Sequence, residues 1–478
     1  MDTAATDDDL AGSNRPVDTV LALSVAWAPD ASLLGQVLLV PTNRGEHVFG
    51  RGAEGDDSPL PRLLLSEQRP KLTRTMGGLD NPFVSRNQFR VSSDGKELAL
   101  VNEGKRALLD EAGVARNELR LAPGQACEIK GQLVLVCVRR PVSLPPLRSW
   151  PQKSLQLFGE ADLHGFVGES PLAWELRDQC AFVAGRAAHV LVLGESGSGK
   201  EVIARAIHAL SPRNKRQLVS RNAATIPATL IDAELFGNVA NYPQSGMPER
   251  LGLVGEADGS TLFLDEIGEL PEELQTRLLR LLDDGGDYQR LGDAKRRTVN
   301  LRFIGATNRA ASALKHDVAA RLKLRLTLPG LNERREDIPL IARHLLLRAV
   351  RTDPDVGARF FEKWDGKRGE PRITAALARR LVTHVYRTHV RELDALLWCA
   401  LASSPDGDIE LTAEVEREFE QGADDTATER RSVHELPVEE LRAALERADW
   451  VQERAWRDLG LANRHVLKRL VKKYGLKK

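Results

Sequence analysis

The residues best suited to chemistry form a short glycine-rich run. Residues 194–200 read Gly-Glu-Ser-Gly-Ser-Gly-Lys and satisfy the pattern GxxxxGK. They follow an apolar strand-like run, Val190–Leu193, and precede apolar residues at helical spacing. Glycines let backbone N–H groups turn toward phosphate oxygens, the helix N-terminus adds positive potential, and Lys200 reaches the β- and γ-phosphates. The predicted nucleotide site consists of Gly194, Glu195, Ser196, Gly197, Ser198, Gly199, Lys200 and Glu201, of which Glu201 replaces the usual Ser or Thr.

A pair of carboxylates follows a second apolar run. Leu262–Leu264 ends in Asp265 and Glu266, which predicts one carboxylate to bind Mg²⁺ and one to polarise the attacking water. Asn308 ends the next apolar strand, where its side chain could sense the γ-phosphate or simply form a turn. Acidic residues are common at strand ends, so this pair indicates a catalytic site only in combination with the phosphate loop.

These residues need a parallel sheet to position them. From about residue 161 strand-like and helix-like runs alternate, which predicts an α/β core at 161–332 with ligands at the strands' carboxyl ends. Residues 333–418 are predicted to be all-helical, and residues 419–436 are polar and are predicted to be a linker.

The N-terminal part has a different pattern. After an acidic tail at 1–16, residues 17–140 contain short strand-like runs without helices, and Asp94–Gly95 is a hairpin signal between two of them. This predicts a β-sandwich. The prolines within 141–160 predict a linker. The predicted strands are Val20–Val25, Gln36–Val40, Glu46–Phe49, Gln88–Val91, Glu97–Val101, Ala126–Ile129 and Leu133–Val138.

Composition limits the class of protein. The chain has 478 residues, of which 42% are hydrophobic and 28% charged, which is typical of a globular, multidomain protein. The sequence shows no secretory signal and no run of the ~18 apolar residues that a membrane span needs. Its four cysteines have no metal-binding spacing, so they are predicted to be reduced thiols in a cytoplasmic protein. The net charge of the chain is zero. Residues 464–478, however, contain seven Lys or Arg side chains and no Asp or Glu, which favours a nucleic-acid contact at this end of the chain.

Residues 161 to about 418 resemble the AAA+ ATPase domain of bacterial enhancer-binding proteins, the activators of sigma-54 RNA polymerase. The segments that carry the resemblance are Gly194–Glu201, Glu234–Gly237, Ala257–Glu269, Gln275–Leu279, Gly305–Asn308, Asn332–Pro339 and Val390–Leu393. The family also has Glu at the position of Glu201. The resemblance implies ATP and Mg²⁺ as cofactors and a ring-shaped homo-oligomer.

The resemblance also implies roles for further residues. Asn222 matches the asparagine that holds the catalytic glutamate, and Arg321 matches an arginine finger that enters the neighbouring subunit's site. Arg391 matches the sensor arginine of the lid.

Three segments depart from the family pattern. Lys315 stands where the family has a second finger arginine, and Tyr386–His389 replaces Trp-Pro-Gly-Asn. The family's GAFTGA loop, which touches the sigma factor, is replaced by Asn241–Gly246, and Pro243 stands where the family has Phe.

The C-terminal residues 437–478 resemble the Fis-type helix-turn-helix. Ala455–Leu461 provides a helix, a glycine turn and an apolar anchor, and Asn463 can cap the next helix. A solvated basic helix is the alternative interpretation. The predicted DNA-binding residues are Asn463, Arg464, His465, Lys468, Arg469 and Lys472.

The N-terminal sandwich resembles a forkhead-associated (FHA) domain, which binds phosphothreonine peptides. Gly50–Arg51 and Ser85–Arg86 match two of its signatures, so Arg51, Ser85 and Arg86 are predicted to bind a phosphopeptide. Gln88 stands where the family has His, and the family's Asn-Gly is missing. The alternative is a degenerate FHA fold that contacts proteins without reading phosphate.

The predicted fold class is therefore multidomain: an all-β FHA-like sandwich, an α/β AAA+ P-loop domain with a helical lid, and an all-α helix-turn-helix. The predicted function is an ATP-hydrolysing, DNA-binding transcriptional regulator of the sigma-54 activator type. The predicted partners are DNA, sigma-54 RNA polymerase, a phosphothreonine protein and further copies of the chain. The alternative is a diverged AAA+ regulator or remodelling scaffold that no longer activates sigma-54 polymerase, which the altered loop favours. A metabolic kinase is disfavoured because no substrate-binding motif accompanies the phosphate loop.

Overall fold

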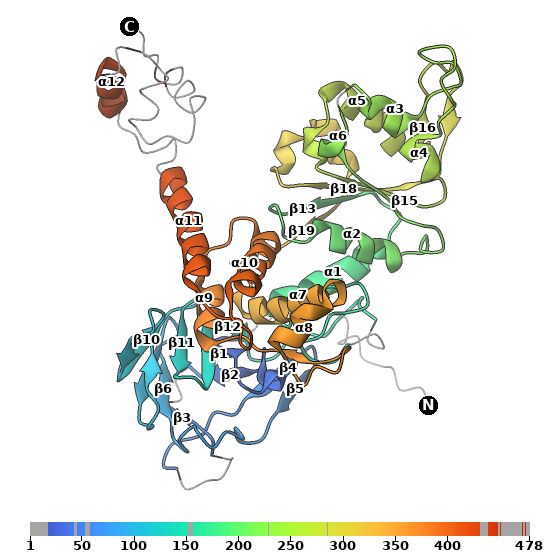
Figure 1. Cartoon of the computed structure of the whole chain (residues 1–478). Helices are drawn as coiled ribbons and strands as arrows, with labels where there is room; N and C mark the ends of the chain where they lie inside the picture. The colour runs from blue at the N-terminus through green and yellow to red at the C-terminus, as the bar shows by residue number, and fades with distance from the viewer. Residues whose placement is uncertain are drawn as a thin grey trace, which may run out of the picture. The chain divides into compact units, whose positions relative to one another are not determined.

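A computed structural model describes residues 18–42, 45–52, 58–151, 156–227, 229–283, 285–430, 438–447, 450, 471 and 474. The chain forms two compact units. The first unit consists of residues 1–397 with 406–409, and the second consists of 398–405 with 410–478. Figure 1 shows the elements of both units, which are described separately below.

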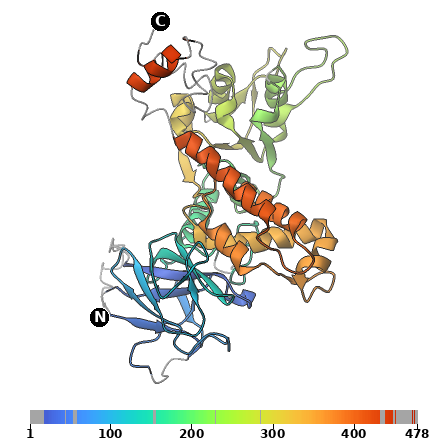
Figure 2. The same ribbon diagram turned by 60° about the vertical axis from the view of Figure 1, so that its left-hand side comes forward.

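The N-terminal region is all-β, as predicted, and has two sheets (Figures 1 and 2). The larger sheet has the strand order β5-β4-β2-β1-β12-β11-β8-β9, and the smaller has the order β10-β7-β6-β3. Strand bounds are β1 Thr19–Trp27, β2 Val37–Val40, β3 His47–Phe49, β4 Ser66–Arg69, β5 Leu72–Thr75, β6 Phe89–Ser93, β7 Leu98–Asn102, β8 Leu108–Leu109, β9 Ala115–Arg116, β10 Glu118–Leu121, β11 Ala126–Ile129 and β12 Leu133–Pro141.

Strand β1 is buried on both faces. Leu21, Leu23 and Val25 point into the core between the two sheets. The alternate residues Ala22 and Ser24 are also fully buried, because helix α9 (Ala375–Thr383) contacts β1, β11 and β12. The apolar run of β1 thus serves two interfaces, which is why it does not alternate with polar residues.

The α/β core contains a five-stranded parallel sheet with the order β14-β15-β18-β13-β19. Alternate residues of the central strands enter different apolar clusters: Leu262 and Leu264 pack on one face, and Phe263 packs on the other. Both faces are therefore buried, as the apolar runs predicted. The bounds are α1 Pro171–Ala184, β13 Val190–Leu193, α2 Lys200–Ala209, β14 Val219–Asn222, α3 Ile231–Phe236, α4 Gly252–Glu256, β15 Thr261–Asp265, α5 Glu272–Leu282, β16 Asp287–Tyr288, β17 Arg297–Thr298, β18 Arg302–Thr307, α6 His316–Arg321 and β19 Leu324–Thr327.

The region after residue 333 is mostly helical and differs from the prediction in two places. A small hairpin of β20 (Phe361–Glu362) and β21 (Glu370–Pro371) interrupts it. Helix α11 (Ala413–Arg430) continues through residues 419–430, where a linker was predicted, because that polar stretch has few helix-breaking residues. The remaining helices are α7 Ile338–Thr352, α8 Pro354–Phe360, α10 His389–Ser403 and α12 Val438–Arg447.

Ion pairs join the sandwich to the ATPase region within the first unit. Arg140 at the end of β12 lies 2.5 Å from Glu336, which precedes α7, and both side chains are buried. Arg140 also donates to the Glu169 carbonyl oxygen, and Arg69 of β4 pairs with the Glu169 carboxylate at 2.5 Å. Burial raises the pKa of Glu336, and the nearby Arg140 opposes that shift. The sandwich is therefore bonded to the ATPase region by paired buried charges, and the predicted linker at 141–160 is not its sole connection.

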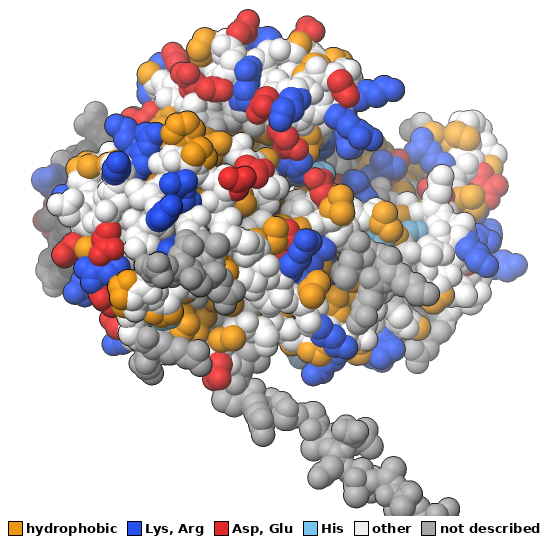
Figure 3. Space-filling view, turned by 90° about the horizontal axis from the view of Figure 1, so that it is seen from below, with side chains coloured by type: hydrophobic (Ala, Val, Ile, Leu, Met, Phe, Trp, Pro, Cys, Tyr) orange, Lys and Arg blue, Asp and Glu red, His pale blue; other side chains and the backbone are white. Residues whose placement is uncertain are grey.

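One face of the molecule carries a mixture of charges (Figure 3). On the face seen in Figure 3, basic, acidic and hydrophobic side chains are interspersed. This agrees with the zero net charge of the whole sequence.

Candidate phosphate site and partner loops

The phosphate loop connects β13 to α2. Gly197 has φ +78° and Gly199 has φ +104°, a region of backbone space that favours glycine. Lys200 is 6% exposed, and its Nζ donates to the carbonyl oxygens of Gly194 and Glu195 at 3.0 and 3.3 Å. The structure thus gathers the predicted residues into one loop that ends at a helix N-terminus.

Two buried polar atoms, one in this loop and one on an arginine bonded to it, lack hydrogen-bond partners from any described residue. Among the described residues, Ser198 Oγ and Arg334 Nε are buried without a hydrogen-bond partner. Arg334 is 3% exposed, and its Nη2 donates to the Ser198 carbonyl oxygen at 3.5 Å. Burial lowers the pKa of Arg334, as expected where a cation is withdrawn from water. An anion here would give these groups the partners they lack.

Arg334 was not singled out individually by the sequence. It belongs to the segment Asn332–Pro339, which carried the family resemblance. Its distance from the loop in sequence, 136 residues, leaves no local pattern that could link it to Ser198.

The two carboxylates lie beside the phosphate loop. Glu266 Oε1 is 3.6 Å from Lys200 Nζ, and Glu266 Oε2 accepts from the Asn308 backbone N–H at 3.3 Å. Glu266 has φ +54°, which costs a non-glycine residue of order 1 kcal/mol and is common at functional sites. Burial raises the pKa of Asp265, while nearby Lys200 opposes that shift. The carboxyl ends of β13, β15 and β18 therefore meet at one edge of the sheet, as predicted.

Asn222 lies next to this pair but is bonded elsewhere. It is the register partner of Asp265 across β14 and β15. Its Oδ1 accepts from the Ala224 backbone N–H at 2.9 Å and caps a short helical turn. Asn222 thus lies beside Asp265 in the sheet while its side chain is bonded to the turn that follows it.

The Mg²⁺ ligand set is sparse on the protein side. Within the described part of the chain, no group of three or more His, Cys, Asp or Glu side chains is arranged to hold a metal ion. Mg²⁺ bound with ATP usually takes one or two carboxylates, with phosphate oxygens and water completing its shell. Asp265 fits such a role, because it stands at the strand end beside Lys200.

Hydrogen bonds hold both the predicted sensor arginine, Arg391, and the predicted finger arginine, Arg321. Arg391 Nη1 donates to Ser196 Oγ at 3.0 Å, so this lid residue touches the phosphate loop directly. Arg321 Nε donates to Asp283 Oδ1 at 2.5 Å, and its side chain is one-third exposed. Arg321 therefore lies at the surface of its own subunit. Lys315, in the position of the family's second finger, donates to Thr276 Oγ1.

The segment that replaces GAFTGA forms a closed loop. Asn238 Nδ2 donates to the carbonyl oxygens of Val239 and Pro248, and the Asn241 side chain accepts from the Gly246 N–H at 2.8 Å. The ring of Tyr242 lies so close to Gly292 that a Cβ there would be 2.5 Å from it.

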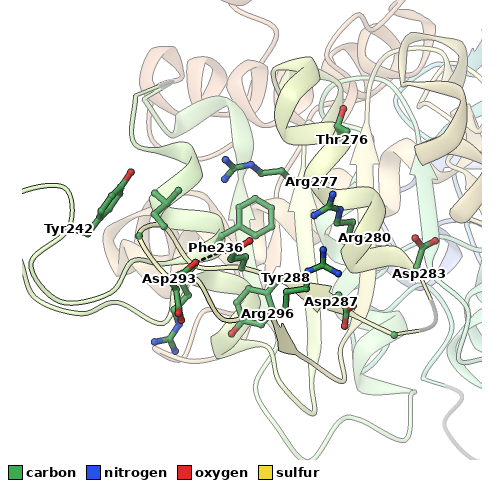
Figure 4. A pocket seen from close by; sticks show the side chains of 15 residues that line it. Phe236, Tyr242, Thr276, Arg277, Arg280, Asp283, Asp287, Tyr288, Asp293 and Arg296 are labelled. Carbon is green, nitrogen blue, oxygen red and sulfur yellow. Dashed lines mark hydrogen bonds between the residues drawn. The ribbon is translucent and has the colours of Figure 1, made fainter.

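Tyr242 also borders a cavity of about 710 Å³ between this loop, α5 and the β16–β17 hairpin. In Figure 4, Tyr242 lies at one end of the cavity and Asp283 at the other, and Arg277 and Arg280 come from α5. Arg277 is already paired with Asp232 at 2.6 Å.

Three loops of the N-terminal sandwich converge on Ser85. The backbone N–H of Arg51 donates to the Ser85 carbonyl oxygen at 3.1 Å, and the backbone N–H of Lys105 donates to Ser85 Oγ at 3.0 Å. Gln88 is fully buried and links these loops through Ser85 N–H and the Arg106 carbonyl oxygen. The side chains of Arg51 and Arg86 are exposed. Gln88 thus organises the loops from the position where the FHA family has His.

The predicted DNA-binding residues lie outside the described residues. These are Asn463, Arg464, His465, Lys468, Arg469 and Lys472. Across the residues that the structure does describe, no helix is both long and apolar enough to span a membrane.

Comparison with known proteins decides the family. The profile of the "Sigma-54 interaction domain" matches residues 166–329. The Nif-specific regulatory protein of Azotobacter vinelandii is 34% identical over 452 residues, which is 89% of this chain and 80% of that protein. The chain belongs to the sigma-54-dependent transcriptional regulators. The resemblance of residues 161 to about 418 to this family is thereby confirmed.

Other members of this family of regulators are similar over shorter stretches. The transcriptional regulatory protein ZraR of Salmonella typhimurium is 33% identical over 327 residues, which is 64% of this chain and 68% of that protein. Among solved structures, NtrX from Brucella abortus in complex with ADP is 27% identical in sequence, with a TM-score of 0.47. The match spans 66% of this chain and 70% of the NtrX chain.

Replacing Asp265 with Asn should separate stability from function. The raised pKa of Asp265 means that its ionised form is less favourable in the folded than in the unfolded chain, so losing the charge should leave the melting temperature at pH 8 unchanged or higher. The same change removes a carboxylate suited to Mg²⁺, and Mg²⁺-dependent ATP hydrolysis should fall by about 100-fold or more. Thermal unfolding and a phosphate-release assay measure the two effects. Glu256→Gln, at the exposed end of α4, is the control; a lower melting temperature for Asp265→Asn would contradict the prediction.

Proposed function

We propose that this protein is an ATP-hydrolysing, DNA-binding transcriptional regulator that works as a homo-oligomer. One observation carries the proposal: the phosphate loop that holds Lys200 also holds Ser198 Oγ, unpartnered within the described part of the structure, and Arg334, whose Nε is likewise unpartnered, donates to this loop through Nη2. Bound Mg²⁺ would neutralise phosphate charge, and Asp265 would hold it. Glu266, at the same sheet edge, would orient the attacking water.

The exposed position of Arg321 supports the need for assembly. Its guanidinium pairs with Asp283 of the same subunit at 2.5 Å, and both side chains are accessible to solvent. An ion pair this open to water is weakened by solvent screening, so Arg321 can exchange Asp283 for a neighbour's phosphate at little cost.

The specific ATPase activity should rise with protein concentration, because a lone subunit lacks the neighbour's Arg321. Arg321→Ala should lower turnover by roughly 10³-fold, the usual contribution of an arginine finger, and change nucleotide affinity little. Lys200→Ala should abolish nucleotide binding. The matched control is Arg348→Ala, an exposed lid arginine with 3.5 Å contacts to Asp394. A specific activity independent of concentration would contradict the assembly requirement.

We further propose that the loop at 241–246 weakens engagement of sigma-54 polymerase. Tyr242 packs on Gly292, and Asn238 and Asn241 tie the loop through hydrogen bonds. A polar, internally bonded loop offers less apolar surface to a partner than the family's GAFTGA. This supports the diverged regulator over the standard activator.

Replacing Asn241–Gly246 with GAFTGA should raise binding of sigma-54 and ATP-dependent transcription above the level of the unaltered protein. Transcription in vitro with purified polymerase carrying each sigma factor, with and without ATP, measures this. The control is a variant that carries both the graft and Lys200→Ala, which should bind sigma-54 without activating. Strong ATP-dependent activation by the unaltered protein would overturn this part of the proposal.

DNA binding is proposed for residues 437–478 because that segment carries eleven Lys or Arg against six Asp or Glu. Its affinity should fall steeply with salt, since phosphate contacts release counterions. Gel shifts of the full chain and of a chain ending at residue 430 test this, and equal binding by both would place the DNA contact elsewhere.

A phosphothreonine partner is proposed for the FHA-like loops. The hydroxyl of Ser85 accepts from the Lys105 N–H and still has its own proton to donate, and exposed Arg51 and Arg86 lie on two adjoining loops. Arg51→Ala should weaken binding of a phosphothreonine peptide by about tenfold, the scale of one charge-assisted hydrogen bond. A peptide library read by fluorescence polarisation measures this, with Arg116→Ala on β9 as the control. Binding that ignores phosphorylation would favour the degenerate FHA module.

A further inference from the structure

A short lid segment lies directly on the phosphate loop. The Val390 backbone N–H donates to the Gly197 carbonyl oxygen at 3.1 Å. The Thr388 carbonyl oxygen approaches Gly197 so closely that a Cβ would lie 2.0 Å from it. Residues near the start of α10 therefore touch the loop that would surround the phosphates.

His389 sits between these contacts and is almost completely buried. Its side chain is 2% exposed, and its ring packs against Gly330. The Leu331 backbone N–H donates to His389 Nδ1 at 3.3 Å. Because Nδ1 accepts this bond, the ring proton of neutral His389 resides on Nε2.

Nε2 is aimed at the phosphate loop. It donates to Glu195 Oε2 at 2.7 Å, a distance typical of a hydrogen bond to a charged acceptor. The two residues are 194 positions apart in the sequence, one in the lid and one in the core. Residues 386–389 are also where this chain departs from the family's Trp-Pro-Gly-Asn, and the shorter asparagine side chain could not span the same distance.

We propose that His389 is a positioning residue that holds the lid closed on the phosphate loop by donating to Glu195, and so slows release of bound nucleotide. The inference rests on the proposed nucleotide-binding function. Opening the lid would break this hydrogen bond and expose the buried imidazole to solvent. Arg391 contacts the same loop through Ser196, but His389 is buried and is held on its other side by Leu331. His389 therefore has a fixed geometry from which to hold Glu195.

The test uses the full-length protein and a fluorescent N-methylanthraniloyl-ADP probe with Mg²⁺. His389→Ala should speed dissociation of the probe by about tenfold, the scale of one hydrogen bond to a charged group. Glu195→Ala should do the same, and its side chain is 72% exposed, so this change leaves the core packing untouched. The double variant should be no faster than either single variant, because both remove one shared contact.

Two further variants distinguish the proposed role of the His389–Glu195 hydrogen bond from a general structural role of these residues. Glu195→Gln keeps an acceptor oxygen but loses the charge, so its dissociation rate should lie between the rates of the unaltered protein and of Glu195→Ala. His316→Ala replaces a histidine whose side chain is 97% exposed and serves as the matched control. In ATP hydrolysis, His389→Ala should raise KM with kcat changed less than about twofold, since the contact acts on binding rather than on the chemical step.

The outcomes distinguish the two levels of inference. The proposal would be overturned if the increases in probe dissociation rate caused by the two single variants multiplied in the double variant. It would also be overturned if the Glu195→Ala protein released the probe at the unaltered rate. Binding of the probe that survives Lys200→Ala would instead contradict the proposed nucleotide site.

Discussion

The carboxylate of Asp337 is fully buried and accepts three hydrogen bonds from Glu169 and Ser170 at the start of α1. The adjacent Glu336 pairs with Arg140 of the N-terminal sandwich. Two neighbouring residues thus bond the first lid helix to both the ATPase core and the sandwich. Removing one partner of a buried ion pair typically costs about 3–5 kcal/mol, so these groups restrict how the three parts can be arranged.

The same segment reaches the phosphate loop. Arg334, three residues before Asp337, lies under the loop and donates to Ser198. Residues 334–337 therefore contact the loop, the core and the sandwich within one turn of chain. Short, buried contacts therefore connect these places, and the lid segment around His389 adds a second connection to the loop.

The candidate catalytic residues are held in arrangements that folding alone would not favour. Glu266 has a positive φ, burial raises the pKa of Asp265, and Ser198 Oγ has no partner among the described residues. Each of these features destabilises the folded chain locally, and the packing of the surrounding sheet offsets that destabilisation. The apolar residues of β15, buried on both faces, supply that support.

The sequence by itself determined the phosphate loop, the carboxylate pair and the family, because their residues are contiguous and their patterns local. It also predicted seven strands of the sandwich, but not β4, β5, β8, β9 or β10, which are only two to four residues long. Only the tertiary structure decided which distant residues meet: Arg334 with Ser198, His389 with Glu195, and Arg321 with Asp283. Such pairs leave no periodic signal, since their contact depends on how the sheet, lid and loops pack rather than on their neighbours in the chain.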